Sequence, residues 1–394
     1  MRGALTRSGT SPLPQRPEER SITPSGPAPA SRDLRVLMLA SDAHGGFGGI
    51  SQYNRDVLEA LSGLDRVAEV VVLPRAVREP VIAAPAKVRY DLAGAGGLLP
   101  FLARSAAQGL AGGRLHLVYC AHINLMPVAA LIARARRIPL VLAIYGIDAW
   151  QRPASRLATA SLRAADLVIS ISQITLDRFR AWSGGPGAAA VVPNAIRPQC
   201  YGPGPKAADL VERHGLAGRK VIMTLGRMSP TERYKGFDEV IGVLPRLRAA
   251  EPGIVYLAAG DGDDRPRLEA EARQAGVADI VIFPGRIPDA RKADYYRLAD
   301  AYVMPSSGEG FGFVVLEALA CGVPVVASAA DGTREAVLDG TLGAVVDPGD
   351  PAALQTAIQT ALRQPKRVPR GLEFFSFENF AARLGLALTR VVDI

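Results

Sequence analysis

The chain has 394 residues, which is long for one hydrophobic core and makes two domains the natural expectation. Its 48% apolar and 21% charged residues are ordinary for a globular protein and exclude a shortage of core-forming side chains. The net charge of +8 is uneven: residues 33–196 carry 17 basic and 11 acidic side chains, whereas residues 197–394 carry 24 and 25. The first half therefore either attracts an anionic lipid, a lipid-linked diphosphate or a nucleic acid, or simply has a solvated arginine-rich face.

Residues 1–32 are rich in Pro, Ser, Gly and Arg and contain no apolar run. Such a segment cannot bury enough surface to fold, so it is predicted to be a disordered tail. It also lacks the uninterrupted apolar stretch of a secretory signal, and no later stretch is long enough to span a membrane. The three cysteines are widely spaced, which suits a reducing compartment. Together these features favour a cytoplasmic protein.

The first folded half alternates apolar runs with helical patterns. Residues 34–41, LRVLMLAS, are rich in strand formers and lead into the glycine-rich loop DAHGGFGGIS and then into an amphipathic stretch at 52–61. Further strands are expected at 70–73, 115–119, 140–144, 167–171 and 190–192. Alternating strands and helices are typical of a parallel, doubly wound α/β sheet.

A second series of the same kind follows a break. Residues 191–206, VVPNAIRPQCYGPGPK, are too rich in Pro and Gly to continue a helix or strand. Strands are then expected at 221–225, 254–258, 280–283, 301–304, 323–327 and 343–346. Residues 375–392 have helical periodicity, with Ser376 as the N-cap.

The predicted fold is therefore α/β, with two Rossmann-like, doubly wound parallel-sheet domains. The predicted boundaries are a tail at 1–32, a first domain at 33–196, a linker at 197–206, a second domain at 207–374, and a final helical segment at 375–394 that returns to the first domain.

The stretch MPSSGEGFGFVVLEALACGVPVVAS (304–328) combines a strand, a Ser/Gly loop and a helix. Gly310 and Gly312 let the backbone approach a ligand closely, and the free amides at the helix start favour an anion. Glu309 precedes the helix and Glu317 lies one turn inside it, so both carboxylates can accept hydrogen bonds from a hydroxyl-rich ligand. Alternatively, Glu309 caps the helix and Glu317 is an exposed helix residue.

Two cations follow another strand, in TLGRMSPTERYKGFDEVI (224–241). Arg227 ends the strand, and Lys235 lies where the next helix begins. Cations near a helix N-terminus, at the carboxyl end of a parallel strand, are placed as a diphosphate clamp would be. Together with the two glutamates, they indicate a site for a nucleotide sugar.

These motifs resemble the retaining glycosyltransferases of family 4, whose GT-B architecture sets two Rossmann-like domains facing across a cleft. The resemblance spans residues 34–390. It is carried by EGFGFVVLE as the family's Glu-x7-Glu motif, GR…YKG as its Arg/Lys pair, GGFGG, VPNAI, LAAGDG and FSFENF.

The resemblance implies a role for each matching residue. Arg227 and Lys235 would bind the donor diphosphate and neutralise the leaving group, and Glu309 would contact hydroxyls of the transferred sugar. The main-chain amides expected to assist are those of Gly310, Phe311 and Gly312. Glu317 would hold the ribose hydroxyls.

Other family positions complete the implied site. The backbone around Arg286 and Ile287 would contact the base, while Gly48 and Gly49 would let the first-domain loop close on the phosphates and sugar. His122, in YCAHINL, matches the family's histidine beside the donor sugar.

The chain departs from the family pattern at YGID, where many relatives have His-Gly-x-Asp. Tyr145 replaces the histidine, and the retained Asp148 is expected to bind the donor, in a role that this change leaves open. The sequence GDGDD (260–264) resembles a metal-binding motif, but its glycines and its position after a strand are typical of a turn. No metal is expected there.

The implied reaction moves a sugar, with retention of configuration, from a nucleoside diphosphate to an acceptor hydroxyl without a cofactor. Relatives use donors such as GDP-mannose and UDP-glucose. The basic first domain would suit a lipid-linked or saccharide acceptor in exopolysaccharide or glycolipid assembly, with peripheral contact between an anionic membrane and the arginines at 134, 136 and 137. Nucleic acid is not an expected partner. A nucleotide-sugar epimerase and a catalytically silent partner subunit stay open as alternatives.

Overall fold

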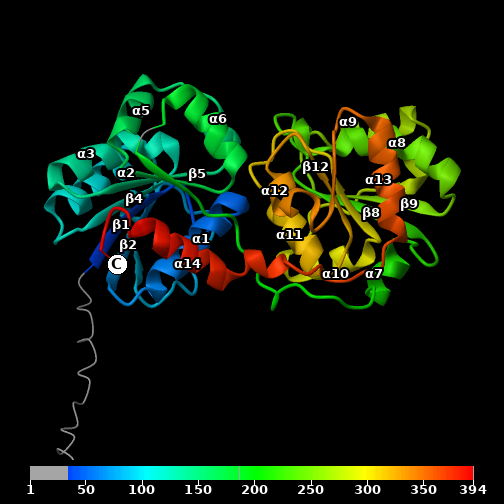
Figure 1. The fold of residues 1–394 in the computed structure, drawn as a ribbon, viewed down its shortest axis with the longest axis horizontal. Coiled ribbons are helices and arrows are strands. Elements are labelled where there is room, and N and C mark those ends of the chain that lie inside the picture. Colours follow the sequence, from blue (N-terminus) through cyan, green and yellow to red (C-terminus); the bar gives the residue numbers. More distant parts are fainter. Residues whose placement is uncertain (1–33, 186, 394) are drawn as a thin grey trace, which may run out of the picture. The chain divides into compact units, whose positions relative to one another are not determined.

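The computed structural model describes residues 34–185 and 187–393, so the predicted tail at 1–32 lies outside the described residues. Two parallel β-sheets form the framework, each with helices on both faces (Figure 1). The predicted α/β fold class with two Rossmann-like sheets is confirmed.

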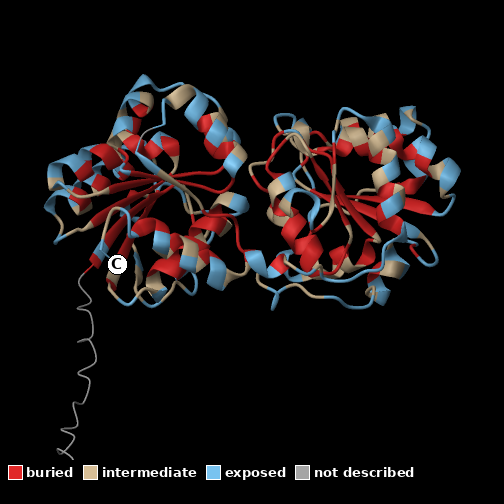
Figure 2. Cartoon of the chain, in the orientation of Figure 1, coloured by how far each residue is buried: buried red, intermediate tan, exposed pale blue. Residues whose placement is uncertain are grey.

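The first sheet has seven strands in the order β3-β2-β1-β4-β5-β6-β7, all paired in parallel. Its strands are β1 (Leu34–Ala40), β2 (Val67–Pro74), β3 (Val88–Tyr90), β4 (Leu117–Ala121), β5 (Leu140–Ile144), β6 (Leu167–Ser170) and β7 (Ala188–Val191). The inner strands β1, β4, β5 and β6 are almost entirely buried, because helices cover both faces (Figure 2). Burial on both faces explains why these strands read as continuous apolar runs.

The helices of this half are α1 (Gly49–Gly63), α2 (Leu98–Ala106), α3 (Met126–Arg136), α4 (Ile147–Trp150), α5 (Arg156–Ser161) and α6 (Gln173–Ser183). Helix α3 contacts both α2 and α5, and these three helices cover one face of the sheet, whereas α1 covers the other (Figure 1).

The second sheet has six parallel strands in the order β10-β9-β8-β11-β12-β13. Its strands are β8 (Lys220–Leu225), β9 (Ile254–Ala259), β10 (Val281–Ile282), β11 (Ala301–Met304), β12 (Val325–Ser328) and β13 (Ala344–Val346). Its helices are α7 (Ala208–Arg213), α8 (Phe237–Ala250), α9 (Arg265–Gln274), α10 (Lys292–Leu298), α11 (Phe313–Ala320), α12 (Thr333–Ala336) and α13 (Pro351–Arg363).

The strand order reverses once in each sheet, between β1 and β4 and between β8 and β11. In open α/β sheets, ligands bind outside the carboxyl ends of the strands at such switch points. The loops that leave β1, β8 and β11 are the glycine-rich loop, the loop with Arg227 and the loop with Glu309. Chain topology therefore places all three motif-bearing loops at switch points.

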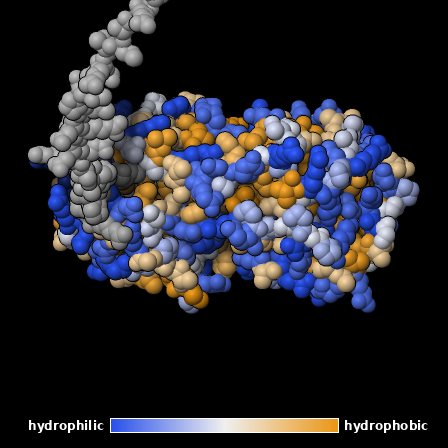
Figure 3. Space-filling view, turned by 60° about the horizontal axis from the view of Figure 1, so that its bottom comes forward, coloured by the Kyte–Doolittle hydropathy of each residue, from blue (hydrophilic) through white to orange (hydrophobic). Residues whose placement is uncertain are grey.

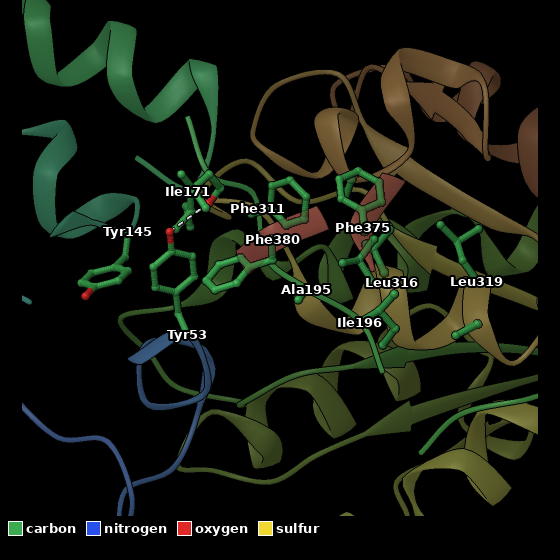
Figure 4. Close-up of a cluster of buried hydrophobic side chains, with 14 of the residues drawn as sticks. Tyr53, Tyr145, Ile171, Ala195, Ile196, Phe311, Leu316, Leu319, Phe375 and Phe380 are labelled. Atoms are coloured by element: carbon green, nitrogen blue, oxygen red, sulfur yellow. Dashed lines mark hydrogen bonds between the residues drawn. The ribbon is translucent and has the colours of Figure 1, made fainter. Parts of the chain in front are cut away.

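The last helix, α14 (Phe377–Leu388), packs against α1 of the first half. The predicted N-cap is confirmed, since the Ser376 side chain accepts a hydrogen bond from the amide of Asn379. The ring of Phe380 meets that of Tyr53 edge to face at 5.4 Å, inside a buried cluster that also holds Phe311 (Figure 4). The end of the chain thus helps to support α1, whose first residues adjoin the candidate site.

Candidate functional site

A pocket of about 310 Å³ lies where the loops after β8 and β11 meet the start of α1 and the α4 segment. Eight of the residues predicted from the sequence line it: Gly49, Asp148, Arg227, Lys235, Glu309, Gly310, Phe311 and Gly312. The other five do not line it: Gly48, His122, Arg286, Ile287 and Glu317.

Lys235 reaches the pocket at the end of a short 3₁₀ turn, Arg233–Lys235. Gly236 ends this turn with φ of 88°, and a Cβ there would lie 2.7 Å from Pro305, so only glycine lets the turn sit against the loop after β11. Lys235 Nζ donates to Glu309 Oε1. Burial disfavours the lysine charge, but Glu309, Tyr234 and Glu232 together outweigh burial and raise the pKa of Lys235.

Arg227 is the pocket's second cation, and 72% of its side chain is exposed. Its Nη2 lies 2.8 Å from Glu232 Oε1, and the other oxygen of Glu232 lies 3.6 Å from Lys235 Nζ. Glu232 therefore pairs with both cations of the pocket.

Hydrogen bonds to residues 331 and 332 hold the loop at 305–312 in place, while several of its amides have no acceptor among the described residues. The Glu309 amide donates to Asp331 Oδ2 at 2.8 Å, and the Glu309 carbonyl accepts from the Gly332 amide at 2.9 Å. Within the described part of the chain, the amides of Gly310, Phe311 and Gly312 donate to no acceptor. They precede α11, so the loop presents several free donors to the pocket.

Close packing of two loops brings the first half of the chain to the same place. A Cβ on Gly310 would lie 1.9 Å from the carbonyl oxygen of Tyr145, and one on Gly146 would lie 2.8 Å from the Gly310 Cα. Both positions must therefore be glycine for the backbones to touch. This contact brings Asp148, two residues after Gly146, to the pocket beside the Glu309 loop.

Tyr145, which replaces the family histidine, is buried in the pocket wall. Its hydroxyl donates to Asn54 Oδ1 at 2.7 Å, and its ring meets that of Tyr53 at 5.5 Å. Burial raises the pKa of Tyr145 far above its usual value. The side chain therefore shapes the wall and has no free proton-accepting group at neutral pH.

Glu317 is buried on α11, outside the pocket lining. The Tyr201 hydroxyl donates to its Oε1 at 2.8 Å, and the Tyr296 hydroxyl donates to its Oε2 at 2.7 Å. Lys292 Nζ lies 3.8 Å from Oε1. The reading of Glu317 as an exposed helix residue is wrong, because two tyrosines enclose its carboxylate.

His122 also lies outside the pocket lining, at the end of β4. Its Nδ1 accepts a hydrogen bond from the Asn124 amide at 3.1 Å. Burial and the charge of Arg75 lower the pKa of His122, so the ring is neutral near pH 7. The geometry accounts for His122 as a cap of the short turn that follows.

Three other predicted residues lie outside the pocket lining. Gly48 has φ of 91°, which favours glycine, and starts α1 as its N-cap. The Arg286 guanidinium lies 5.0 Å from the centre of the Phe47 ring in this loop. Ile287 is buried in the apolar core.

Sequence reasoning missed several residues of the pocket, chiefly Glu232, Tyr234 and Asn194. Glu232 lies three residues before Lys235, and this i, i+3 spacing could have indicated an ion pair. Tyr234 and Asn194 line the pocket because loops that are distant in the sequence pack together, and a local sequence pattern cannot predict this.

The GDGDD turn serves the scaffold around the pocket. Asp264 accepts hydrogen bonds from Arg233 and Arg267, and Asp261 faces Arg265. Within residues 34–185 and 187–393, no group of three or more His, Cys, Asp or Glu side chains is placed to hold a metal ion.

Two domain families match this chain. Residues 209–370 match the family described as "Glycosyl transferases group 1", and residues 48–195 match the "Glycosyl transferase 4-like domain". The first match covers all six strands of the second sheet, and the second covers strands β2 to β7 of the first sheet.

Among characterised proteins, the chain is similar to a GDP-mannose-dependent alpha-(1-6)-phosphatidylinositol monomannoside mannosyltransferase of Mycolicibacterium smegmatis. The two are 36% identical over 258 residues, which cover 63% of this chain and 66% of that relative. It is also 35% identical over 216 residues to D-inositol 3-phosphate glycosyltransferase 2 of Catenulispora acidiphila, covering 52% of this chain and 50% of that one. Each match spans less than two thirds of the relative's own length.

Solved structures agree with the fold. Sucrose-phosphate synthase from Thermosynechococcus elongatus superposes with a TM-score of 0.71 at 23% identity, covering 91% of this chain and 99% of that one. The Anabaena protein HepE, in complex with UDP and glucose, superposes with a TM-score of 0.69 at 23% identity, covering 91% and 100%.

Proposed function

This chain belongs to the family 4 glycosyltransferases of GT-B fold, and we propose that it transfers a sugar from a nucleoside diphosphate to an acceptor hydroxyl with retention of configuration. The observation that carries this proposal is one pocket in which Arg227, Lys235 and Glu309 meet three free backbone amides. Cations and amides suit a diphosphate, and the carboxylate suits sugar hydroxyls.

The donor diphosphate is proposed to lie between the two cations and the loop amides. Lys235 is held by Glu309 and Glu232, so its position is set before the donor binds. Arg227 is largely exposed and can turn toward a phosphate once it leaves Glu232. Preorganised donors aimed at the oxygens where negative charge develops lower the barrier to bond breaking.

In the proposed reaction, negative charge develops on the leaving diphosphate. The bond between the anomeric carbon and the phosphate oxygen breaks, and the acceptor oxygen bonds to the same face of that carbon. The leaving phosphate oxygen takes the proton of the acceptor hydroxyl, while Arg227 and Lys235 stabilise the diphosphate charge. This front-face course needs no carboxylate nucleophile and no metal or other cofactor.

Glu317 is proposed to hold the ribose hydroxyls, which requires a change at its carboxylate. Tyr201 donates to Oε1, so a ribose hydroxyl that binds this oxygen competes with the tyrosine for it. Tyr296 can keep its bond to Oε2. Donor binding would thereby compete with a residue between the two sheets.

The relatives' names point to donor and acceptor candidates. One relative is named for GDP-mannose and a phosphatidylinositol mannoside, and another for D-inositol 3-phosphate. We therefore propose a GDP- or UDP-linked hexose as donor and a lipid-linked or saccharide acceptor, bound by the more basic half of the chain. Glycolipid or exopolysaccharide assembly on the cytoplasmic face of a membrane would supply such acceptors.

Because a lipid-linked acceptor would lie in a membrane, we also propose that the surface around α2 contacts the membrane peripherally. Leu98 and Leu99 are 57% and 77% exposed, and Arg134 and Arg137 on and after the neighbouring α3 are exposed. Arg136, the third arginine of the predicted basic group, is half-buried and donates to the carbonyls of two nearby glycines at 2.7 and 2.6 Å. Within residues 34–185 and 187–393, no helix is long and apolar enough to cross a bilayer.

Co-sedimentation with vesicles tests this contact. Anionic vesicles should retain more protein than neutral ones, and Arg134→Ser with Arg137→Ser should remove this difference. Leu98→Ser with Leu99→Ser should lower retention on both vesicle types. Leu386→Ser, at another exposed leucine on α14, is the control. Equal retention on both vesicle types contradicts the proposal.

Release of nucleoside diphosphate from a panel of nucleotide sugars tests the activity. GDP-mannose, UDP-glucose and UDP-N-acetylglucosamine, each with D-inositol 3-phosphate or phosphatidylinositol, form a first panel. Diphosphate release that Arg227→Ala abolishes supports the proposal. Interconversion of the donor without an acceptor would instead indicate an epimerase, and binding without turnover a silent subunit.

A further inference from the structure

Asp148 lies in the first turn of α4, directly after the Tyr145–Gly146 loop end of β5. The backbone of Gly146 touches that of Gly310, so this turn is held against the loop that carries Glu309. Asp148 reaches the pocket from the first half of the chain, whereas Arg227 and Lys235 reach it from the second.

One oxygen of the Asp148 carboxyl has no partner. Its Oδ2 is buried and makes no hydrogen bond within the described part of the chain. Burial raises the pKa of Asp148 to about 7, although backbone groups at Tyr145, Gly146 and Asp148 itself lower it. A capping role accounts for the backbone contacts but leaves the second oxygen unexplained, and buried polar atoms in folded proteins nearly always have a partner.

The neighbouring polar groups indicate what kind of ligand could bond to Asp148 Oδ2. The hydroxyls of Tyr145 and Tyr53 are already bonded, to Asn54 Oδ1 and to the Val192 carbonyl. Asn194, which also lines the pocket, has a second buried acceptor without a hydrogen-bond partner, its Oδ1. Two open acceptors and no cation fit a ligand that donates hydrogen bonds, such as a hydroxyl group, and do not fit a phosphate.

We propose that Asp148 contacts the substrate directly, with its Oδ2 accepting a hydrogen bond from a hydroxyl of the transferred sugar or of the acceptor. The inference rests on the proposed function, because it takes the pocket to be the sugar-transfer site. The diphosphate end of the donor would lie on the Arg227 and Lys235 side, which leaves the hydroxyl-bearing end for Asp148.

The charge state of Asp148 matters for this role, because a carboxylate accepts hydrogen bonds more strongly than a carboxylic acid. The other titratable groups that line the pocket come from both halves of the chain: Tyr53 and Tyr145 from the first, and Arg227, Glu232, Tyr234, Lys235 and Glu309 from the second. Tyr53 and Tyr145 are neutral throughout the working range, because burial raises their pKa far above 10. Asp148 can therefore give the enzyme an acid limb near neutral pH.

The test compares Asp148→Asn with Asp177→Asn, a control at an exposed carboxylate on α6 that bonds only to Gln173. Affinities for GDP, UDP, GDP-mannose and UDP-glucose are measured by calorimetry, and donor hydrolysis and transfer are followed across pH. Asp148→Asn should lower kcat/KM for transfer by tenfold or more, on the order of a lost charge-assisted contact, and should remove the acid limb near pH 7. The control should match the wild type.

The binding data identify the hydroxyl. Weaker binding of the nucleotide sugar with unchanged binding of the free diphosphate assigns the contact to the transferred sugar. Unchanged binding and hydrolysis with slower transfer assign it to the acceptor. Unchanged transfer and pH profile, equal loss of affinity for all four nucleotides, or failure of the nearly isosteric Asp148→Asn chain to fold would overturn the proposal. Absence of wild-type turnover on every donor would instead count against the proposed function.

Discussion

Replacement of Gly310 by alanine tests whether the two loops around the pocket must touch. The added Cβ would lie 1.9 Å from the Tyr145 carbonyl oxygen, whereas Cβ atoms essentially never approach closer than 3.0 Å. The loops must therefore separate by at least about 1 Å. The Gly310 backbone has no φ in the left-handed region, so the substitution introduces a clash without backbone strain.

The magnitude follows from this displacement. A misplacement of about 1 Å between reacting groups costs on the order of a hundredfold in rate, or about 2.7 kcal/mol of transition-state stabilisation. Overpacking at a contact costs about 1–3 kcal/mol of unfolding free energy, so the fold should survive. Diphosphate affinity should also fall, because the displaced loop carries the Gly310 amide and Glu309, which holds Lys235.

The assay measures kcat/KM for transfer, diphosphate affinity and thermal unfolding for Gly310→Ala. Gly242→Ala is the matched control, because a Cβ on that exposed glycine of α8 meets nothing within 4 Å. Wild-type turnover by Gly310→Ala would refute the reasoning, since the contact between the loops would then be dispensable for catalysis.

Four further predictions address single interactions. Lys235→Ala should lower kcat more than a hundredfold, by about 3 kcal/mol or more, while the chain still folds; turnover near the wild-type rate would remove Lys235 from the clamp. Tyr201→Phe should bind the nucleotide sugar more tightly, because it frees one oxygen of Glu317; calorimetry showing equal or weaker binding would contradict this competition. Activity should persist in excess EDTA, and loss of activity that Mg²⁺ or Mn²⁺ restores would refute metal independence. Because burial raises the folded-state pKa of Asp148 above its unfolded value, the carboxyl stabilises the fold below about pH 4 and loses this contribution as pH rises through about 7. Asp148→Asn should therefore gain unfolding free energy relative to the wild type over that range, and a pH-independent difference in urea denaturation would refute the shift.

Most strands could be predicted because parallel strands buried on both faces read as apolar runs. β3 was missed, since its three residues are only partly buried and include the exposed Arg89. Helix α7 was also missed, because Leu210 is its one buried residue among the described positions. Such short elements are stabilised by contacts with residues distant in the sequence, which a local sequence pattern cannot predict.

The site, like the fold, could be predicted only in part. Strand, loop and helix order was enough to predict that Arg227, Lys235 and Glu309 adjoin one site, because switch points follow from topology. The side-chain partners could not be predicted, because they are distant in the sequence. Tyr201, for example, lies 116 residues from Glu317 and donates a hydrogen bond to it. The contact of Gly310 with Tyr145 likewise joins loops from two different sheets.

The anomeric configuration of the product, followed by NMR during turnover, tests the central claim most directly. We predict that the donor signal falls as free nucleoside diphosphate and a new glycoside appear in equal amounts, with the glycoside keeping the donor's anomeric configuration. Inversion at the anomeric carbon would contradict the front-face course. An isomerised nucleotide sugar without diphosphate release would contradict glycosyl transfer itself.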